Sequence, residues 1–198
     1  MAVDSGMVWA RESTPNGRWV HRFKWQYQDD RSAAGGRGSA HIAGPDSIRF
    51  DVAGPLGASP AAAMVVGDLP VWVRPEDAIA KLVPSYPLLW AAFGVARLPA
   101  GGVVVWAGKA GATFSWRAVA GTDTIEWARH PGPGGRLVAE VRRGTAVLGR
   151  VETRFGADGL PLSARLIVPG VPARLDLTFT KSESSAHFPP DVWRPREP

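Results

Sequence analysis

The four histidines of the chain are spaced too widely to suggest a metal site or a catalytic pair. His21, His41, His130 and His187 lie far apart, and no two of them are four residues apart, as on one face of a metal-binding helix. His21 falls on the aromatic side of an alternating segment, so we expect it to line a core or a cavity. The chain has no cysteine, which excludes a disulfide, a thiolate zinc site and a catalytic thiol. No metal site is therefore predicted.

The motifs of hydrolases and nucleotide-binding enzymes are also missing. A serine nucleophile on a strand-to-helix elbow needs Gly-x-Ser-x-Gly, and neither Gly38-Ser39-Ala40 nor Ala58-Ser59-Pro60 fits it. No helix pattern follows Gly35-Gly36-Arg37-Gly38, as a dinucleotide-binding loop requires. The acid pairs Asp29-Asp30 and Glu76-Asp77 fit a turn and a helix N-terminus. We therefore expect a protein that is not an enzyme and has no cofactor; an enzyme would need convergent polar groups inside an apolar cavity.

The basic residues are numerous but dispersed. The 23 Lys and Arg against 18 Asp and Glu give a net charge of +5, and Arg142-Arg143 is the only adjacent pair. A nucleic-acid binder would gather such charge on one face and add polar side chains that read bases, so no nucleic-acid partner is expected. A solvated outer sheet face accounts for the charge, and a mild attraction to anionic lipid headgroups is a second use for it.

Large apolar side chains are the most informative feature for function. Nine Trp and seven Phe must line either a core or an apolar cavity. We expect one continuous lipid-binding cavity lined by Trp25, Phe50, Trp72, Leu89, Trp90, Phe93, Trp116 and Trp127. A solid aromatic core is the alternative. An apolar helix beside an open sheet favours the cavity, because an acyl chain can displace such a plug at little cost in exposed surface.

Alternation of apolar and polar residues predicts the strands that would position these side chains. From Trp19 to Tyr27 the odd positions are aromatic, and the even ones are mostly polar or charged, which is typical of a half-buried strand. Similar short segments follow one another up to Lys181, with a Gly/Ser/Asp-rich connection at 29–38. The sequence therefore predicts a mainly β protein, an open (incomplete) antiparallel barrel of about eleven strands.

Two short helices are predicted to interrupt the strands. Pro75, followed by two acidic residues, starts the first helix, and Pro87 starts a second that is apolar nearly all round. We expect them to form a helical lid over about residues 75–97. Residues 1–17 are predicted to be a flexible arm, and 18–198 to be one domain with a Pro-rich tail at 188–198.

Membrane and targeting segments are not evident. No run approaches the ~20 apolar residues of a membrane-spanning helix. Residues 1–4 show neither the basic nor the apolar region of a signal peptide.

Four stretches, at residues 46–57, 76–82, 88–99 and 155–161, together resemble the LolA/LolB-like superfamily of bacterial lipoprotein carriers and receptors. Residues 46–57 resemble the strand and Pro-Leu-Gly loop of the outer-membrane lipoprotein receptor family LolB. The predicted helix at 76–82, and the Leu-Leu-Trp helix that runs into 94–99, are also similar to that family. Phe155-x-x-x-Gly159-Leu-Pro161, followed by an alternating strand, resembles the last third of the wider superfamily. The order of elements agrees over about residues 18–185.

The resemblance implies a non-enzymatic carrier or receptor that holds acyl chains of lipoproteins or other lipids in an apolar cavity. It implies a place in the periplasm or at the periplasmic face of the outer membrane, with an acylated lipoprotein or lipid and the membrane surface as partners. Leu56 matches the exposed apolar residue with which LolB-like proteins engage the membrane. The chain departs from LolB in lacking a lipid-attachment cysteine and in its tail from Phe188. We expect a monomer; the alternative is an interaction module of the bacterial envelope with a filled core.

Overall fold

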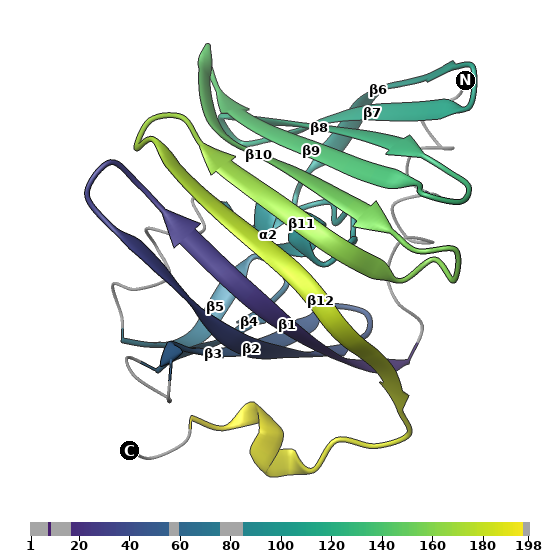
Figure 1. Ribbon diagram of the computed structural model, residues 1–198. Coiled ribbons are helices and arrows are strands. Elements are labelled where there is room, and N and C mark those ends of the chain that lie inside the picture. Colours follow the sequence, from purple (N-terminus) through teal and green to yellow (C-terminus); the bar gives the residue numbers. More distant parts are fainter. Residues whose placement is uncertain (1–7, 9–16, 56–59, 76–84, 196–198) are drawn as a thin grey trace.

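Twelve strands form one antiparallel sheet in this computed structural model, in the order β5-β4-β3-β2-β1-β12-β11-β10-β9-β8-β7-β6 (Figure 1). The structure describes residues 8, 17–55, 60–75 and 85–195, and most of the predicted N-terminal arm lies outside this part of the chain. Strands account for 62% of the described residues, and the sheet does not close. The prediction of a mainly β protein with an open sheet is therefore confirmed, with twelve strands in place of about eleven.

Hairpins connect most consecutive strands, so neighbours in the sequence are mostly neighbours in the sheet. The strands are β1 (Arg18–Gln28), β2 (Ala33–Ala43), β3 (Ser47–Ala53), β4 (Ala61–Val66), β5 (Leu69–Arg74), β6 (Val103–Ala110), β7 (Thr113–Ala120), β8 (Asp123–His130), β9 (Arg136–Arg143), β10 (Ala146–Phe155), β11 (Pro161–Val168) and β12 (Ala173–Ser185). The exception is the pairing of β1 with β12, which joins the two ends of the chain at the middle of the sheet.

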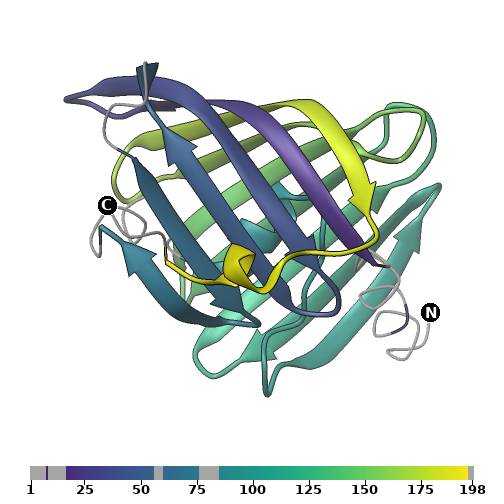
Figure 2. The ribbon, with the colours of Figure 1, turned by 90° about the horizontal axis from the view of Figure 1, so that it is seen from below.

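The sheet curls around helix α2 (Tyr86–Ala92), which lies inside the curve in both views (Figures 1 and 2). The helix contacts β9, β10 and β11. We call the face of the sheet that holds α2 the inner face and the opposite one the outer face. Strand β1 shows why the sheet has two such faces: His21 and Phe23 are buried, whereas Arg22 and Lys24, which alternate with them, are exposed.

Strand β2 begins earlier than the sequence indicated. The Gly-rich residues before Ser39 were predicted as part of a connection, but Ala33 already pairs with Gln28 of β1. A Cβ atom at Gly36 would lie 1.9 Å from the carbonyl oxygen of Ala53, and one at Gly38 would lie 2.5 Å from the ring of Phe23. Glycine is therefore required here by close packing within the sheet and does not mark a loop.

The second predicted helix is present as α2, whereas the first falls mostly within residues 76–84, outside the described part of the chain. Pro87 stands in the first turn of α2, as expected from its fixed φ. Gly94 ends the helix with a φ of 82°, and its amide donates to the carbonyl oxygen of Ala91 at 2.9 Å. Among the described residues, no helix combines the length and the apolarity needed to cross a membrane.

The C-terminal tail packs on the outer face of β2–β5 and includes the short 3-10 helix η2 (Pro190–Trp193), seen crossing the sheet in Figure 2. Arg49 of β3 donates hydrogen bonds to the carbonyl oxygens of Val192 and Arg194. Trp72 of β5 donates from Nε1 to the carbonyl oxygen of Trp193 at 3.1 Å. The tail therefore covers side chains that the sheet alone would leave in solvent.

Candidate functional site

The inner face of the sheet and α2 enclose an apolar cavity of about 70 Å³. Its lining comes from α2 and from strands β1, β3, β11 and β12, and consists of Phe23, Trp25, Phe50, Val52, Leu88, Leu89, Ala92, Phe93, Leu166, Leu175 and Leu177. The one polar side-chain group among them is the indole N–H of Trp25, which donates to the carbonyl oxygen of Ala53 at 3.2 Å. This lining offers van der Waals contacts to a hydrocarbon chain and no group for acid, base or nucleophilic chemistry.

The size of the cavity limits what it can hold while α2 is in place. An apolar cavity that admits benzene has a volume of about 150 Å³, more than twice the volume found here. Trp25, Val52 and Leu175 are partly exposed, so the lining reaches solvent at these residues. An acyl chain could therefore enter from this side only if α2 moved away from the sheet.

Four of the predicted cavity residues meet in this space. Trp25 and Phe50 contribute from β1 and β3, and Leu89 and Phe93 contribute from α2 and its C-terminal end. Sequence reasoning selected these four for their apolar character and their places in the alternating or helical pattern. Their part in binding lipid remains a prediction.

Trp90 lies on another side of α2 and does not line the cavity. Its Nε1 donates to the carbonyl oxygen of Gly67 at 2.9 Å, and the guanidinium carbon of Arg97 lies 5.3 Å from its ring centroid. The side chain is 1% exposed. Trp90 therefore holds the helix to the turn between β4 and β5.

Trp116 and Trp127 are buried on the inner face but also lie outside the cavity lining. They are direct cross-strand neighbours on β7 and β8, and each is 3% exposed. This position places them in the part of the core between the sheet's β6 edge and α2. They provide packing for that half of the sheet.

Trp72 lies on the outer face and so does not share the cavity. It pairs with Met64, whereas the preceding residue of β4, Ala63, pairs with Phe50 on the inner face. Successive residues of a strand point to opposite faces of the sheet. Because Val71, Trp72 and Val73 are all apolar, the sequence does not indicate which face Trp72 occupies. Trp72 instead contacts the C-terminal tail and the guanidinium of Arg49.

Leu56, the predicted membrane-engaging residue, lies outside the described residues. The described residues that flank its segment, Pro55 and Pro60, are both exposed.

Sequence reasoning did not select several residues that line the cavity. These are Phe23, Val52, Leu88, Ala92, Leu166, Leu175 and Leu177. The sequence pattern does indicate Phe23, because it lies on the same alternating face of its strand as Trp25. Leu175 and Leu177 share an alternating face of β12 in the same way. Leu175 and Leu177 were passed over because aromatic residues were weighted above leucine, a reason that does not apply to Phe23.

His21 is a buried structural residue on the inner face. Its Nδ1 lies 2.7 Å from the hydroxyl oxygen of Ser182, and its ring packs against those of Phe93 and Phe179. Burial lowers the pKa of its imidazole from 6.5 to about 4, so the ring is neutral at physiological pH. Its surroundings are those of a core residue, and within the described part of the chain no three His, Asp or Glu side chains gather as a metal site would require.

The fold is similar to that of solved bacterial proteins, although no protein-family model and no sequence among the curated proteins matches the chain. A LolA superfamily protein from Nitrosomonas europaea gives a TM-score of 0.60 at 10% identity, covering 98% of each chain. A domain described as an outer membrane lipoprotein-sorting protein, from Vibrio parahaemolyticus, gives 0.43 at 8% identity, covering 96% of this chain and 95% of that one. MucB gives 0.44 at 14% identity, covering 98% of this chain and 62% of that one.

The first of these similarities establishes a shared fold, and at such low identity it establishes only that. The LolA/LolB-like architecture predicted from the sequence is therefore confirmed as a fold. A particular closeness to LolB is not shown.

Proposed function

We propose that this protein binds an acyl chain of a lipoprotein or another lipid on the inner face of its curved sheet and catalyses no reaction. The observation that carries this proposal is the wholly apolar lining between α2 and the sheet. The shared fold with a LolA superfamily protein supports it. On this proposal the protein works in the bacterial envelope, in the periplasm or at the periplasmic face of the outer membrane.

Binding on the inner face requires α2 to act as a displaceable plug. The helix has seven residues and no side-chain hydrogen bond at its N-cap. A helix this short is not stable on its own, so packing against the sheet must hold it in place. An acyl chain that took the place of the helix would bury apolar surface at about 25 cal/mol per Å², which offsets the packing energy that the helix gives up.

A protein-interaction module of the bacterial envelope is the second candidate, and the two edges of the sheet favour it. Leu69 and Val71 are exposed on edge strand β5, and Val103, Val105 and Trp106 are exposed on edge strand β6. An apolar edge strand with free backbone groups is a template for pairing with a strand of another protein. This function would leave α2 in place and the inner cavity closed.

Mass spectrometry of lipid extracted from the purified protein, together with titration of an environment-sensitive fatty-acid probe, separates the two candidates. The carrier should yield co-purified acyl lipid and should bind the probe saturably, and a long-chain fatty acid should displace the probe. A protein free of lipid that shows no saturable probe binding would contradict the carrier and leave the interaction module as the account of the fold.

A further inference from the structure

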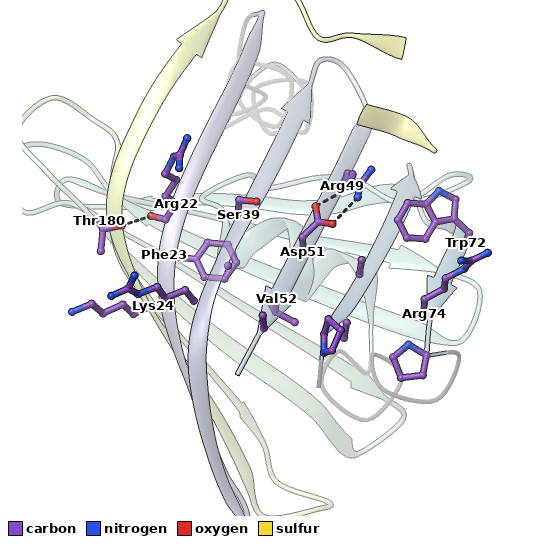
Figure 3. A pocket seen from close by; sticks show the side chains of 17 residues that line it. Arg22, Phe23, Lys24, Ser39, Arg49, Asp51, Val52, Trp72, Arg74 and Thr180 are labelled. Atoms are coloured by element: carbon purple, nitrogen blue, oxygen red, sulfur yellow. Dashed lines mark hydrogen bonds and ion pairs between the residues drawn. The ribbon is translucent and has the colours of Figure 1, made fainter. Parts of the chain in front are cut away.

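A second and larger pocket lies on the outer face of the sheet, over strands β1–β5 (Figure 3). Its volume is about 1100 Å³. The charged residues of its lining alternate along the strands with residues of the inner face. Arg22 and Lys24 stand on either side of Phe23, and Asp51 follows Phe50. The pocket is therefore separated from the inner cavity by a single layer of sheet.

Basic side chains dominate the lining of this outer pocket. Arg22, Lys24, Arg37, Arg49 and Arg74 contribute positive charge, and Asp51 is the only carboxylate among the described residues of the lining. Figure 3 shows Asp51 turned toward Arg49, with which it forms two hydrogen bonds of 2.6 and 2.8 Å. This pair neutralises itself, and Arg22, Lys24 and Arg37 leave the described part of the lining with a net positive charge.

Lys24 and Arg37 are two like charges of this pocket that stand directly opposite each other. They are direct cross-strand neighbours on β1 and β2, both are exposed, and neither forms an ion pair with a described residue. Like charges directly opposite each other destabilise a sheet. Two other basic pairs stand directly opposite each other among the described residues, Arg22–Lys181 and Arg136–Arg154, but in each pair one member has an acidic partner, Glu183 for Lys181 and Glu152 for Arg154. An uncompensated pair at this one place is explained if an anionic ligand supplies the opposite charge.

The pocket also includes described residues that flank Leu56 in the sequence. Ala53 and Pro60, described residues on either side of 56–59, both line it. Leu56 is the residue expected from the LolB resemblance to enter a membrane. Since Leu56 is only three residues from Ala53 in the sequence, its entry into a membrane would bring the cationic pocket near the phosphates of the same surface.

We propose that this outer pocket binds the phosphate of an anionic lipid headgroup at a membrane surface, with Lys24 and Arg37 as its principal contacts. The inference deepens the proposed function, because it names the surface by which the carrier meets the membrane. It places the membrane contact on the outer face and the acyl chain on the inner face.

Lys24→Glu is the variant that tests this site, because the new carboxylate faces Arg37 and replaces a repulsive pair with an attractive one. Arg150→Glu is a matched control: Arg150 is exposed on β10, forms no ion pair with a described residue, and its substitution changes the net charge equally. The full chain and both variants would be sedimented with vesicles of phosphatidylcholine that do or do not contain phosphatidylglycerol.

We expect the wild type and Arg150→Glu to bind the phosphatidylglycerol vesicles, and Lys24→Glu to bind them about tenfold or more weakly, with an unchanged or higher melting temperature. Equal losses in both variants would mean that net charge alone drives binding, and would overturn the site. Equal binding by Lys24→Glu and the wild type, or complete competition by dilute inorganic phosphate or by a DNA duplex, would also overturn it.

The fatty-acid probe keeps this result separate from the proposed function. Lys24→Glu should bind the probe as the wild type does, since Lys24 lies on the outer face. Loss of vesicle binding with intact probe binding supports both proposals. Intact vesicle binding by Lys24→Glu refutes the headgroup site and leaves the acyl-binding proposal standing.

Discussion

The hydroxyl of Thr153, on strand β10, donates a hydrogen bond of 2.6 Å to the carbonyl oxygen of Ala91 in α2. Both residues are fully buried. The same carbonyl also accepts the amide of Gly94. Thr153 is thus a buried polar side chain that connects the helix to the sheet by a hydrogen bond. On the proposed function, the helix and the sheet must separate at this point.

Replacing Thr153 with valine should remove this hydrogen bond without changing the shape of the core. We expect Thr153→Val to lower the free energy of unfolding by about 1 kcal/mol, because Ala91 keeps one of its two donors. Urea denaturation would measure this change. If α2 must move to admit an acyl chain, stopped-flow mixing should also show faster entry of the fatty-acid probe.

Thr178→Val, at an exposed position on β12, is the control for this substitution. It should change neither the unfolding curve nor the rate of probe entry. A probe that enters wild type and Thr153→Val at the same rate would mean that α2 does not gate the inner face.

Removing the charge of Arg49 should detach the tail from the outer face. Its side chain is 2% exposed and bonds to Asp51 as well as to the tail. We expect Arg49→Met to lower the free energy of unfolding by about 2–3 kcal/mol, because Asp51 and two tail carbonyls lose their partner. Limited proteolysis should then cleave the chain after Ser185.

Arg154→Met provides the comparison for Arg49, because the Arg154–Glu152 pair is solvent-exposed. Its loss should cost less than about 0.5 kcal/mol. Equal effects of the two substitutions would show that the tail contacts add nothing to stability.

The buried His21 should make stability depend on pH. Its folded-state pKa, about 4, lies below the ordinary value of 6.5, so the unfolded chain takes up the proton first as the pH falls. The stability that comes from keeping the ring neutral is complete above pH 6.5 and is lost as the pH falls toward 4. From about pH 7 to about pH 5, we expect wild type to lose about 2 kcal/mol relative to His21→Gln.

Urea denaturation of both proteins at the two pH values would check this expectation. Carboxylates titrate in the same way in both proteins, so the difference between them isolates His21. Parallel losses of stability would mean that the ring is protonated in the folded protein.

Alternation carried most of the fold prediction, and it failed where neighbouring residues do not alternate or where glycine is needed inside a strand. The faces of β1 were readable because aromatic and charged residues alternate there. Trp72 was expected in the cavity but lies on the outer face, and its face could not be read from the sequence because both of its neighbours are valines. The early start of β2 was hidden by glycines that packing requires, and with it the pairing of Lys24 with Arg37.

Contacts between distant segments could not be predicted from the sequence. Arg49 sits at an outward position of an alternating strand, where a solvated side chain is expected. It is buried by residues more than 140 positions later in the chain. Local pattern specifies which face a residue occupies, but not which distant segment covers that face.

Binding of the fatty-acid probe to two matched variants shows whether an acyl chain binds on the inner face. Leu175→Glu places a carboxylate at a partly exposed position of the cavity lining on β12. Ile167→Glu places the same group on the outer face of neighbouring β11, at a residue that is 43% exposed. Circular dichroism should show both variants folded.

We predict that wild type and Ile167→Glu bind the probe alike, with displacement by a long-chain fatty acid. Leu175→Glu should bind it at least about tenfold more weakly, because a buried unpaired charge opposes the hydrocarbon. Wild-type affinity in folded Leu175→Glu, or no saturable binding by wild type, would contradict the claim.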